Sequence, residues 1–202
     1  MSGTPTTTRK AGGGTHRLFF ALWPGEATRG QIAALAAQLR ACRPGGRWIP
    51  AERYHLTLQF LGTYRHLPAP LVEAACAAGA QVGSPETTIA LDRVGSFPDR
   101  PHLWWLGCEQ AEPLLPLWEC LTRTLAAHGV PTAPAPLVPH VTLVRGANRA
   151  PPADATVAPV VWRIGHFALV HSESGAATIY HVLRRWPLGL PDLPAAACHR
   201  RD

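Results

Sequence analysis

The order of apolar and polar positions along the chain predicts a mixture of strands and helices. A continuous apolar run at residues 17–23 is typical of a buried strand, and Pro24 and Gly25 end it. Helical spacing of apolar residues predicts one helix through Ile32, Leu35 and Leu39, one at residues 68–82 and one through residues 114–125. Further strands are predicted at residues 47–49, 54–61, 86–94, 102–108, from 140 onwards, 162–170 and 177–186. The pattern indicates an α+β fold with mainly antiparallel sheets and outer helices, since no strand–helix junction carries the glycine-rich phosphate loop of a doubly wound fold.

One tetrapeptide pattern occurs twice, as His55-Leu56-Thr57-Leu58 and as His140-Val141-Thr142-Leu143. Both copies lie in segments predicted as strands, where side chains at positions i and i+2 share a face. Each copy therefore presents a histidine and a threonine together, while its apolar residues turn toward the core. A chain of this composition is expected to contain roughly 0.04 copies by chance. The duplication therefore points to two imidazoles and two hydroxyls at one cleft, a set suited to acid–base chemistry on a phosphoryl group.

Length and composition limit the classes of protein to which this chain can belong. The 202 residues suit one domain, and an apolar fraction of 47% with a charged fraction of 16% is typical of a soluble globular protein. No apolar run is long enough to span a bilayer. Residues 1–16 are polar and lack the apolar stretch of a secretory signal, so we expect a disordered tail on a cytoplasmic protein. Residues 17–187 are expected to form the folded domain, and residues 188–202 a flexible second tail.

Charge and cysteine content narrow the possible partners. The net charge of +6 fits an anionic partner such as RNA, but an arginine-rich composition would also follow from GC-rich coding, so charge alone leaves the partner open. The five cysteines form no C-x-x-C pair, which favours free, mostly buried thiols in a reducing compartment and argues against a structural zinc site.

The two motifs and four segments, one of which contains the second motif, resemble the 2H phosphoesterase superfamily, and within it the RNA 2′,3′-cyclic phosphodiesterases, also called 2′-5′ RNA ligase-like proteins. The segments are Arg17-Leu-Phe-Phe-Ala-Leu-Trp-Pro24, Phe97-Pro-Asp-Arg-Pro-His-Leu-Trp-Trp-Leu-Gly107, His140-Val-Thr-Leu-Val-Arg145, and Leu169-Val-His-Ser-Glu-Ser followed by Tyr180-His-Val-Leu. The resemblance covers residues 17–187. It implies a bilobal fold, with pseudo-symmetric lobes around a positively charged central cleft. It also implies metal-independent hydrolysis of an RNA terminal 2′,3′-cyclic phosphate to a 2′-phosphate, without a cofactor. For a cleft enzyme of this size we expect a monomer.

The motif residues suggest a mechanism. Histidine suits general acid and base roles because its ordinary pKa lies near 6.5. As a hypothesis guided by the resemblance, His140 takes the proton from water and His55 protonates the departing O3′. Thr57 and Thr142 would donate hydrogen bonds to the non-bridging phosphate oxygens.

Other candidate side chains are less well defined by the sequence. The resemblance favours phosphate binding by Arg145, yet strict strand alternation puts Arg145 opposite His140 unless the strand ends or bulges at Val144. Arg100 and His102 are candidate cleft residues. Five aromatic residues are candidates either for base stacking or for the core: Trp48, Tyr54, Phe60, Trp104 and Trp105.

Several other functions remain open at this level. The same residues could run the reaction backwards as a 2′-5′ RNA ligase, or act on another nucleotide phosphodiester. A metal site built from His55 and His140 is disfavoured because neither motif has an adjacent carboxylate on the histidine face. A non-catalytic RNA-binding module would not need both histidines and both threonines.

Overall fold

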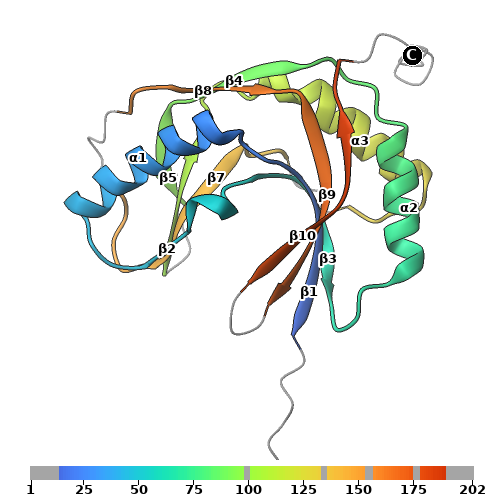
Figure 1. Cartoon of the computed structure of the whole chain (residues 1–202), viewed down its shortest axis with the longest axis horizontal. Coiled ribbons are helices and arrows are strands. Elements are labelled where there is room, and N and C mark those ends of the chain that lie inside the picture. The colour runs from blue at the N-terminus through green and yellow to red at the C-terminus, as the bar shows by residue number, and fades with distance from the viewer. Residues whose placement is uncertain (1–13, 98–100, 133–135, 153–156, 175–177, 190–202) are drawn as a thin grey trace, which may run out of the picture.

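The chain folds into two groups of antiparallel strands with helices beside them (Figure 1). The computed structural model describes residues 14–97, 101–132, 136–152, 157–174 and 178–189. The helices are α1 (Glu26–Cys42), α2 (Ala69–Ala80) and α3 (Leu115–Ala127), with short 3-10 turns η1 (Ala51–Arg53) and η2 (Glu112–Leu114). The strands are β1 (Thr15–Leu22), β2 (Arg47–Trp48), β3 (Leu56–Tyr64), β4 (Thr87–Leu91), β5 (Arg93–Ser96), β6 (His102–Gly107), β7 (His140–Ala147), β8 (Val160–Ile164), β9 (His166–Ser174) and β10 (Ile179–Pro187).

Eight of these strands form one sheet with a narrow joint in the middle. The strand order is β10-β9-β1-β3-β7-β6-β5, with β2 also pairing with β7. The two motif strands, β3 and β7, are joined by a single register pair, Leu56 with Val141. We call the group β1, β3, β9 and β10 the terminal lobe and the group β2, β5, β6 and β7 the central lobe. The predicted α+β class is confirmed, and the two predicted sheets are two halves of one sheet that meet at the motifs.

The lobes are not the two halves of the sequence. The terminal lobe combines strands from both ends of the chain, and α3, from the second half of the chain, packs on β3 of that lobe. Figure 1 shows α2 and α3 beside the terminal lobe and α1 beside the central lobe. The chain passes between the lobes at β4 and at β8, and these two strands pair with each other as a separate antiparallel sheet. One paired connection therefore links the lobes on the side away from the motif joint.

Two strands that the sequence predicts as continuous are each divided in the structure. The prediction at residues 86–94 is wrong because β4 and β5 belong to different sheets, and the chain turns between them at Asp92. The Asp92 carboxylate accepts a hydrogen bond from the Glu109 N–H at 3.0 Å, which holds this turn. The prediction at residues 162–170 is wrong for the same reason, with the break at Gly165 between β8 and β9.

The apolar pattern of the first strand explains its continuous hydrophobic run. Leu18, Phe20 and Leu22 belong to the main core, whereas Phe19 and Ala21 form a second apolar cluster with Ala168 and Val170 on the other face. β1 is thus buried on both sides, which removes the alternation seen in half-exposed strands. It begins at Thr15, inside the segment predicted as a tail; residues 1–13 and 190–202 lie outside the described ranges.

Two composition-based expectations can be compared with the fold. Within the described ranges no helix is long and apolar enough to cross a membrane. Cys42, Cys76 and Cys108 are not disulfide-bonded. Cys120 is buried, but Cys42 is exposed and Cys76 and Cys108 are half-buried, so most of the described cysteines are not buried as predicted. Cys198 lies outside the described residues.

Candidate active site

The two motif histidines stand at the starts of the two central strands. His55 directly precedes β3 and His140 is the first residue of β7, so the Leu56–Val141 pair brings both to the joint between the lobes. The imidazoles are close enough for the charge of His140 to lower the pKa of His55. The structure therefore brings together the two residues that the repeated motif singled out.

Each histidine is held in the same way by the backbone. Nδ1 of His55 lies 2.7 Å from the carbonyl oxygen of Arg53, and Nδ1 of His140 lies 2.8 Å from the carbonyl oxygen of Val138. A carbonyl oxygen only accepts, so Nδ1 carries the proton in both neutral rings. The lone pair of each neutral imidazole is then on Nε2. Both residues thus present equivalent nitrogens that can accept or, once protonated, donate a proton.

Aromatic side chains surround the first histidine far more than the second. The ring of Trp23 stacks on His55 with 5.1 Å between centroids and 16° between planes, while Phe19 and Tyr180 each approach within 5.3 Å. His140 has one aromatic neighbour among the described residues, Phe97, which meets it edge-on at 5.1 Å. The two imidazoles therefore sit in different environments although their backbone anchors are equivalent.

These environments change the proton affinity of both rings. Burial lowers the pKa of His55 from an ordinary 6.5 to about 4, against the opposing effect of the Arg53 carbonyl, and the charges of Arg145 and His140 add to the lowering. Burial also lowers the pKa of His140, with a further contribution from Arg145. In the free protein at neutral pH both imidazoles are consequently neutral for most of the time.

The motif threonines share the strand face of their histidines. Thr57 and Thr142 are both half-buried, whereas the intervening Leu56 and Val141 are fully buried. In the part of the chain that the structure describes, neither threonine hydroxyl forms a hydrogen bond within the protein. Both hydroxyls can therefore donate to an anion placed between the histidines.

A β-bulge decides on which face Arg145 lies. Along β7, Thr142 pairs with Trp105 and Val144 with the adjacent Trp104, so Leu143 is the extra residue and has no partner on β6. Leu143 and Val144 are consequently both buried. The bulge shifts the alternation by one residue and returns Arg145 to the face of His140 and Thr142. The condition that the sequence left open for Arg145 is met.

The first motif strand bulges at the same place. Ala21 pairs with Thr57 and Phe20 with Gln59, which leaves Leu58 without a partner on β1. Gln59 is buried as a result, and its side-chain amide donates to the Thr122 hydroxyl on α3 at 2.6 Å. The residue equivalent to Arg145 in this strand is Phe60, which is 43% exposed.

Arg145 has charged neighbours from both lobes. Burial lowers the pKa of its guanidinium; Tyr180 opposes this lowering, and the charges of Arg17 and Arg47 add to it. Arg47 is the direct cross-strand partner of Arg145 in the β2–β7 pair. The positive charge of the site thus extends beyond the motif residues, on side chains that the sequence analysis did not assign to it.

Known proteins with a similar sequence and fold identify the family of this chain. Residues 22–105 match the family model described as LigT-like phosphoesterase. The RNA 2′,3′-cyclic phosphodiesterase of Escherichia coli K12 is 31% identical over 178 residues, which cover 85% of this chain and 96% of that protein. The crystal structure of E. coli LigT without ligand superposes with a TM-score of 0.71 at 31% identity, covering 88% of this chain and 99% of the other. The chain belongs to the LigT-like phosphoesterase family.

A third relative differs in length. The RNA 2′,3′-cyclic phosphodiesterase of Geobacillus stearothermophilus is 28% identical over 178 residues, and the chain spans 54% of that protein. The match to the LigT-like phosphoesterase model ends before the second motif at His140, which the structure brings beside the first. The family predicted from the repeated motif is confirmed.

The other sequence candidates of this LigT-like phosphoesterase divide between core and cleft. Tyr54 and Trp104 are 3% and 2% exposed and belong to the core, and Trp48 packs edge-on against Trp104. Trp105 pairs with Thr142 and contacts Phe97, so it lies beside the second motif. His102 is half-buried with a buried Nδ1 that has no partner among the described residues, and Arg100 lies outside them.

The aromatic enclosure of His55 is the part of the site that the sequence analysis missed. Trp23 and Tyr180 are more than 150 residues apart in the chain, and no local spacing relates them to the motif. Their segments were noted in the family resemblance, which is the signal that could have assigned them to the site.

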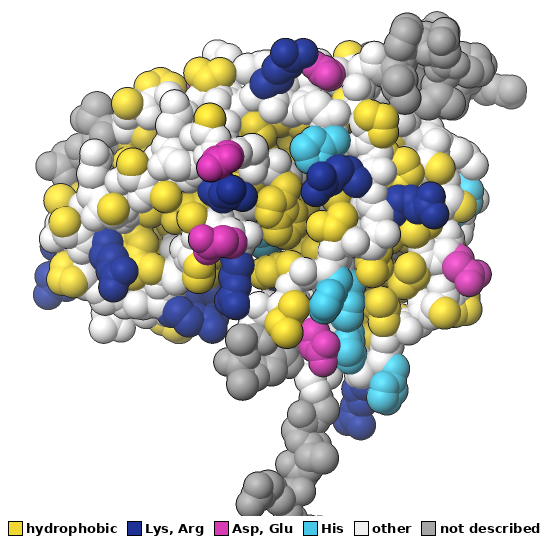
Figure 2. Space-filling view, in the orientation of Figure 1, with side chains coloured by type: hydrophobic (Ala, Val, Ile, Leu, Met, Phe, Trp, Pro, Cys, Tyr) yellow, Lys and Arg dark blue, Asp and Glu magenta, His cyan; other side chains and the backbone are white. Residues whose placement is uncertain are grey.

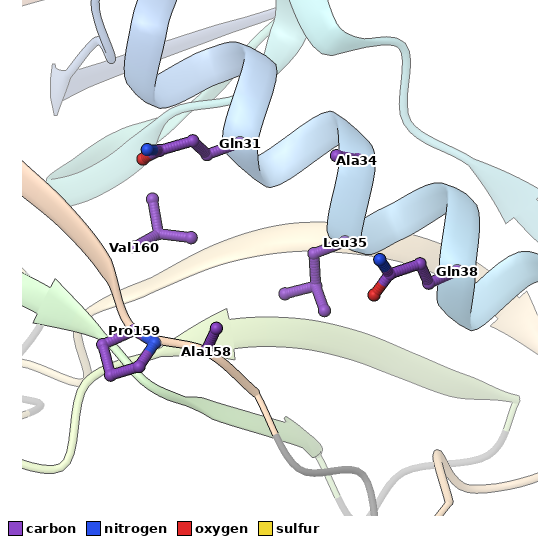
Figure 3. A pocket seen from close by; sticks show the side chains of 7 residues that line it. All are labelled: Gln31, Ala34, Leu35, Gln38, Ala158, Pro159 and Val160. Atoms are coloured by element: carbon purple, nitrogen blue, oxygen red, sulfur yellow. The ribbon is translucent and has the colours of Figure 1, made fainter.

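Two other features lie apart from the motif histidines. A pocket of about 250 Å³ opens between α1 and the segment entering β8, lined by Gln31, Ala34, Leu35, Gln38, Ala158, Pro159 and Val160 (Figure 3). It contains no titratable side chain. His16, His171 and His181 stack on one another, but His171 alternates with Val170 on β9 and so faces away from the side of the sheet that carries Phe19 and His55. Among the described residues no three His, Cys, Asp or Glu side chains are grouped to hold a metal ion.

Proposed function

We propose that this protein hydrolyses RNA ends carrying a 2′,3′-cyclic phosphate to 2′-phosphates, with His55 and His140 as acid and base. The observation that carries the proposal is the matched pair of Nδ1 anchors, which leave two Nε2 atoms free at the joint between the lobes. Opening the cyclic diester needs a base for water and an acid for the departing O3′, roughly in line across phosphorus. The activity named for the relatives from E. coli and G. stearothermophilus supports this choice of substrate.

The unequal surroundings of the two histidines support distinct roles. We assign the base role to His140 and the acid role to His55, because an imidazolium whose pKa is about 4 is a strong acid toward O3′. Protonating His55 at pH 7 costs about 4 kcal/mol in the free protein. A phosphate monoanion about 4 Å away supplies roughly 4 kcal/mol at an effective dielectric constant near 20. The substrate's own charge is thus sufficient to protonate the acid when it binds.

The remaining predicted residues bind the phosphate in this scheme. Thr57 and Thr142 donate hydrogen bonds to the non-bridging oxygens, where negative charge increases in the transition state. The guanidinium of Arg145, on the same face as His140, pairs with these oxygens through its fixed donors. The aromatic enclosure keeps water from His55, so that its proton passes to the leaving oxygen.

The central test is hydrolysis of an RNA oligonucleotide ending in a 2′,3′-cyclic phosphate, with excess EDTA present. The wild type, His55→Ala and His140→Ala are compared, with His66→Ala as a control at an exposed histidine. We expect a 2′-phosphate product, a loss of about 10³-fold or more in kcat for each motif variant, and normal turnover by the control. Near-normal turnover by either motif variant, or a 3′-phosphate product, would refute the two-histidine scheme.

The assignment of acid and base needs a separate substrate, because the pH profile belongs to the coupled pair of histidines. Bis(p-nitrophenyl) phosphate loses a leaving group that needs little protonation. His55→Ala should therefore retain a larger fraction of activity on this diester than His140→Ala does, and the opposite order would reverse the roles.

Including an RNA with a free 5′-hydroxyl in the main assay distinguishes hydrolysis from ligation.

A further inference from the structure

Three arginines from three strands lie close together, on strands of both lobes. Arg47 and Arg145 are direct partners in the β2–β7 pair, and a side chain at each position of such a pair lies on the same face of the sheet. Arg17 belongs to β1, which keeps a regular register with β9 from Thr15 to Ala21. Arg17 therefore shares the face of Phe19, whose ring contacts His55. The cluster thus includes residues of both lobes.

The guanidinium groups of Arg17 and Arg47 are close enough to that of Arg145 for their charges to change its pKa. The charges of Arg17 and Arg47 both lower the pKa of Arg145. Arg17 and Arg47 are exposed, and Arg145 is half-buried. On the face shown in Figure 2, Lys and Arg side chains lie over several parts of the molecule, including the lower left, in the half where Figure 1 labels β2.

No acidic side chain compensates this cluster in the ranges that the structure describes. Arg163 has a carboxylate partner, Glu86, on the separate β4–β8 side of the molecule. Within the described residues, the side chains of Arg17, Arg47 and Arg145 form no ion pair or hydrogen bond. Like charges directly opposite each other in a strand pair are destabilising. An anionic ligand beside these arginines would remove that cost.

We propose that Arg17 and Arg47 form a second phosphate subsite, which binds the phosphodiester on the 5′ side of the terminal nucleotide. The inference rests on the proposed function, in which Arg145 and the two threonines bind the cyclic phosphate itself. A substrate longer than one nucleotide brings a second anion next to the first, and the exposed arginines lie next to Arg145 on both lobes. Because contacts to backbone phosphates carry no base information, the subsite selects for chain length and not for sequence.

The test compares two substrates that differ in this phosphate. One is a trinucleotide ending in a 2′,3′-cyclic phosphate, and the other is a nucleoside 2′,3′-cyclic monophosphate, which has no phosphodiester on its 5′ side. The variants are Arg17→Gln, Arg47→Gln and the double change. Arg40→Gln is the charge-matched control, since Arg40 is exposed in the last turn of α1 and its charge does not act on His55, His140 or Arg145.

The measured quantity is the ratio of kcat/KM on the trinucleotide to kcat/KM on the mononucleotide. We expect each single change to lower this ratio about tenfold, mainly through KM, and Arg40→Gln to leave it at the wild-type value. The salt dependence of kcat/KM on the trinucleotide should also become shallower by about 0.7 in a log–log plot for each arginine removed. An equal loss on both substrates, or an unchanged ratio, would overturn the subsite. A wild type that hydrolyses neither substrate would instead overturn the proposed function, and the subsite with it.

Discussion

The buried state of His55 should make the protein lose stability in mild acid, and the size of this loss follows from its pKa. The pKa of His55 falls from 6.5, its value in an unfolded chain, to about 4 in the folded protein. The unfolded chain therefore binds a proton on this ring at a higher pH than the folded protein does. The resulting stability is present above pH 6.5 and is lost as the pH falls from 6.5 to 4. The full effect is about 3 kcal/mol, and roughly 2 kcal/mol of it is lost between pH 7 and pH 5.

Urea unfolding of the wild type and of His55→Gln at a series of pH values from 7 to 4 measures this effect. Glutamine does not titrate. Between pH 7 and pH 5, the decrease in the free energy of unfolding should therefore be about 2 kcal/mol smaller for the variant than for the wild type. His66→Gln, at an exposed position, controls for the removal of a histidine and should follow the wild type. Parallel curves for the wild type and His55→Gln would show that His55 titrates normally. The account of a substrate-driven protonation would then fail as well.

Four further substitutions test the rest of the site and the packing beside it. Arg145→Gln should lower kcat/KM on the cyclic phosphate by about 100-fold while leaving the urea midpoint close to the wild type, as measured by steady-state kinetics and urea unfolding. Thr57→Val and Thr142→Val should each lower kcat by about 100-fold with little change in KM, because their hydroxyls are expected to act mainly in the transition state. If either change weakened the binding of a product 2′-phosphate by the same factor, a role confined to the transition state would be contradicted. Gly95→Ala should destabilise the protein by about 2 kcal/mol in urea, because the added methyl group would overlap the ring of Trp105; an unchanged midpoint would show that this ring can move aside.

The sequence singled out the motif residues that the structure brings together, but it did not reveal two of the strand boundaries around them. The repeated motif located both histidines and both threonines because residue type and spacing were enough to mark them. The breaks at Asp92 and Gly165 were not predictable in the same way, since apolar residues continue on both sides of each break. Whether a strand stays in one sheet depends on distant partners, here β8 for β4 and β6 for β5.

The side of β7 on which Arg145 lies could not be predicted from the sequence either. In a regular strand, alternation would put Arg145 on the face opposite His140. Only the pairing of β7 with β6 reveals that Leu143 is an extra residue, which reverses this placement. The enclosure of His55 by Trp23 and Tyr180 is likewise a product of long-range pairing, since the two aromatics reach it from opposite ends of the chain. Local pattern could single out the two motif histidines but not the surroundings that lower their pKa values.

The two motif strands carry equivalent bulges, but different residues follow these bulges, so the two histidines have different neighbours. Both motif strands bulge at the motif leucine, so the next residue on the cleft face is Phe60 in one strand and Arg145 in the other. One lobe therefore offers an exposed aromatic ring where the other offers a cation. A cyclic phosphate has a charged side and a sugar side, so this exchange favours one orientation between the lobes. In the proposed mechanism, a fixed orientation would give each histidine its own oxygen, so that one acts as the acid and the other as the base.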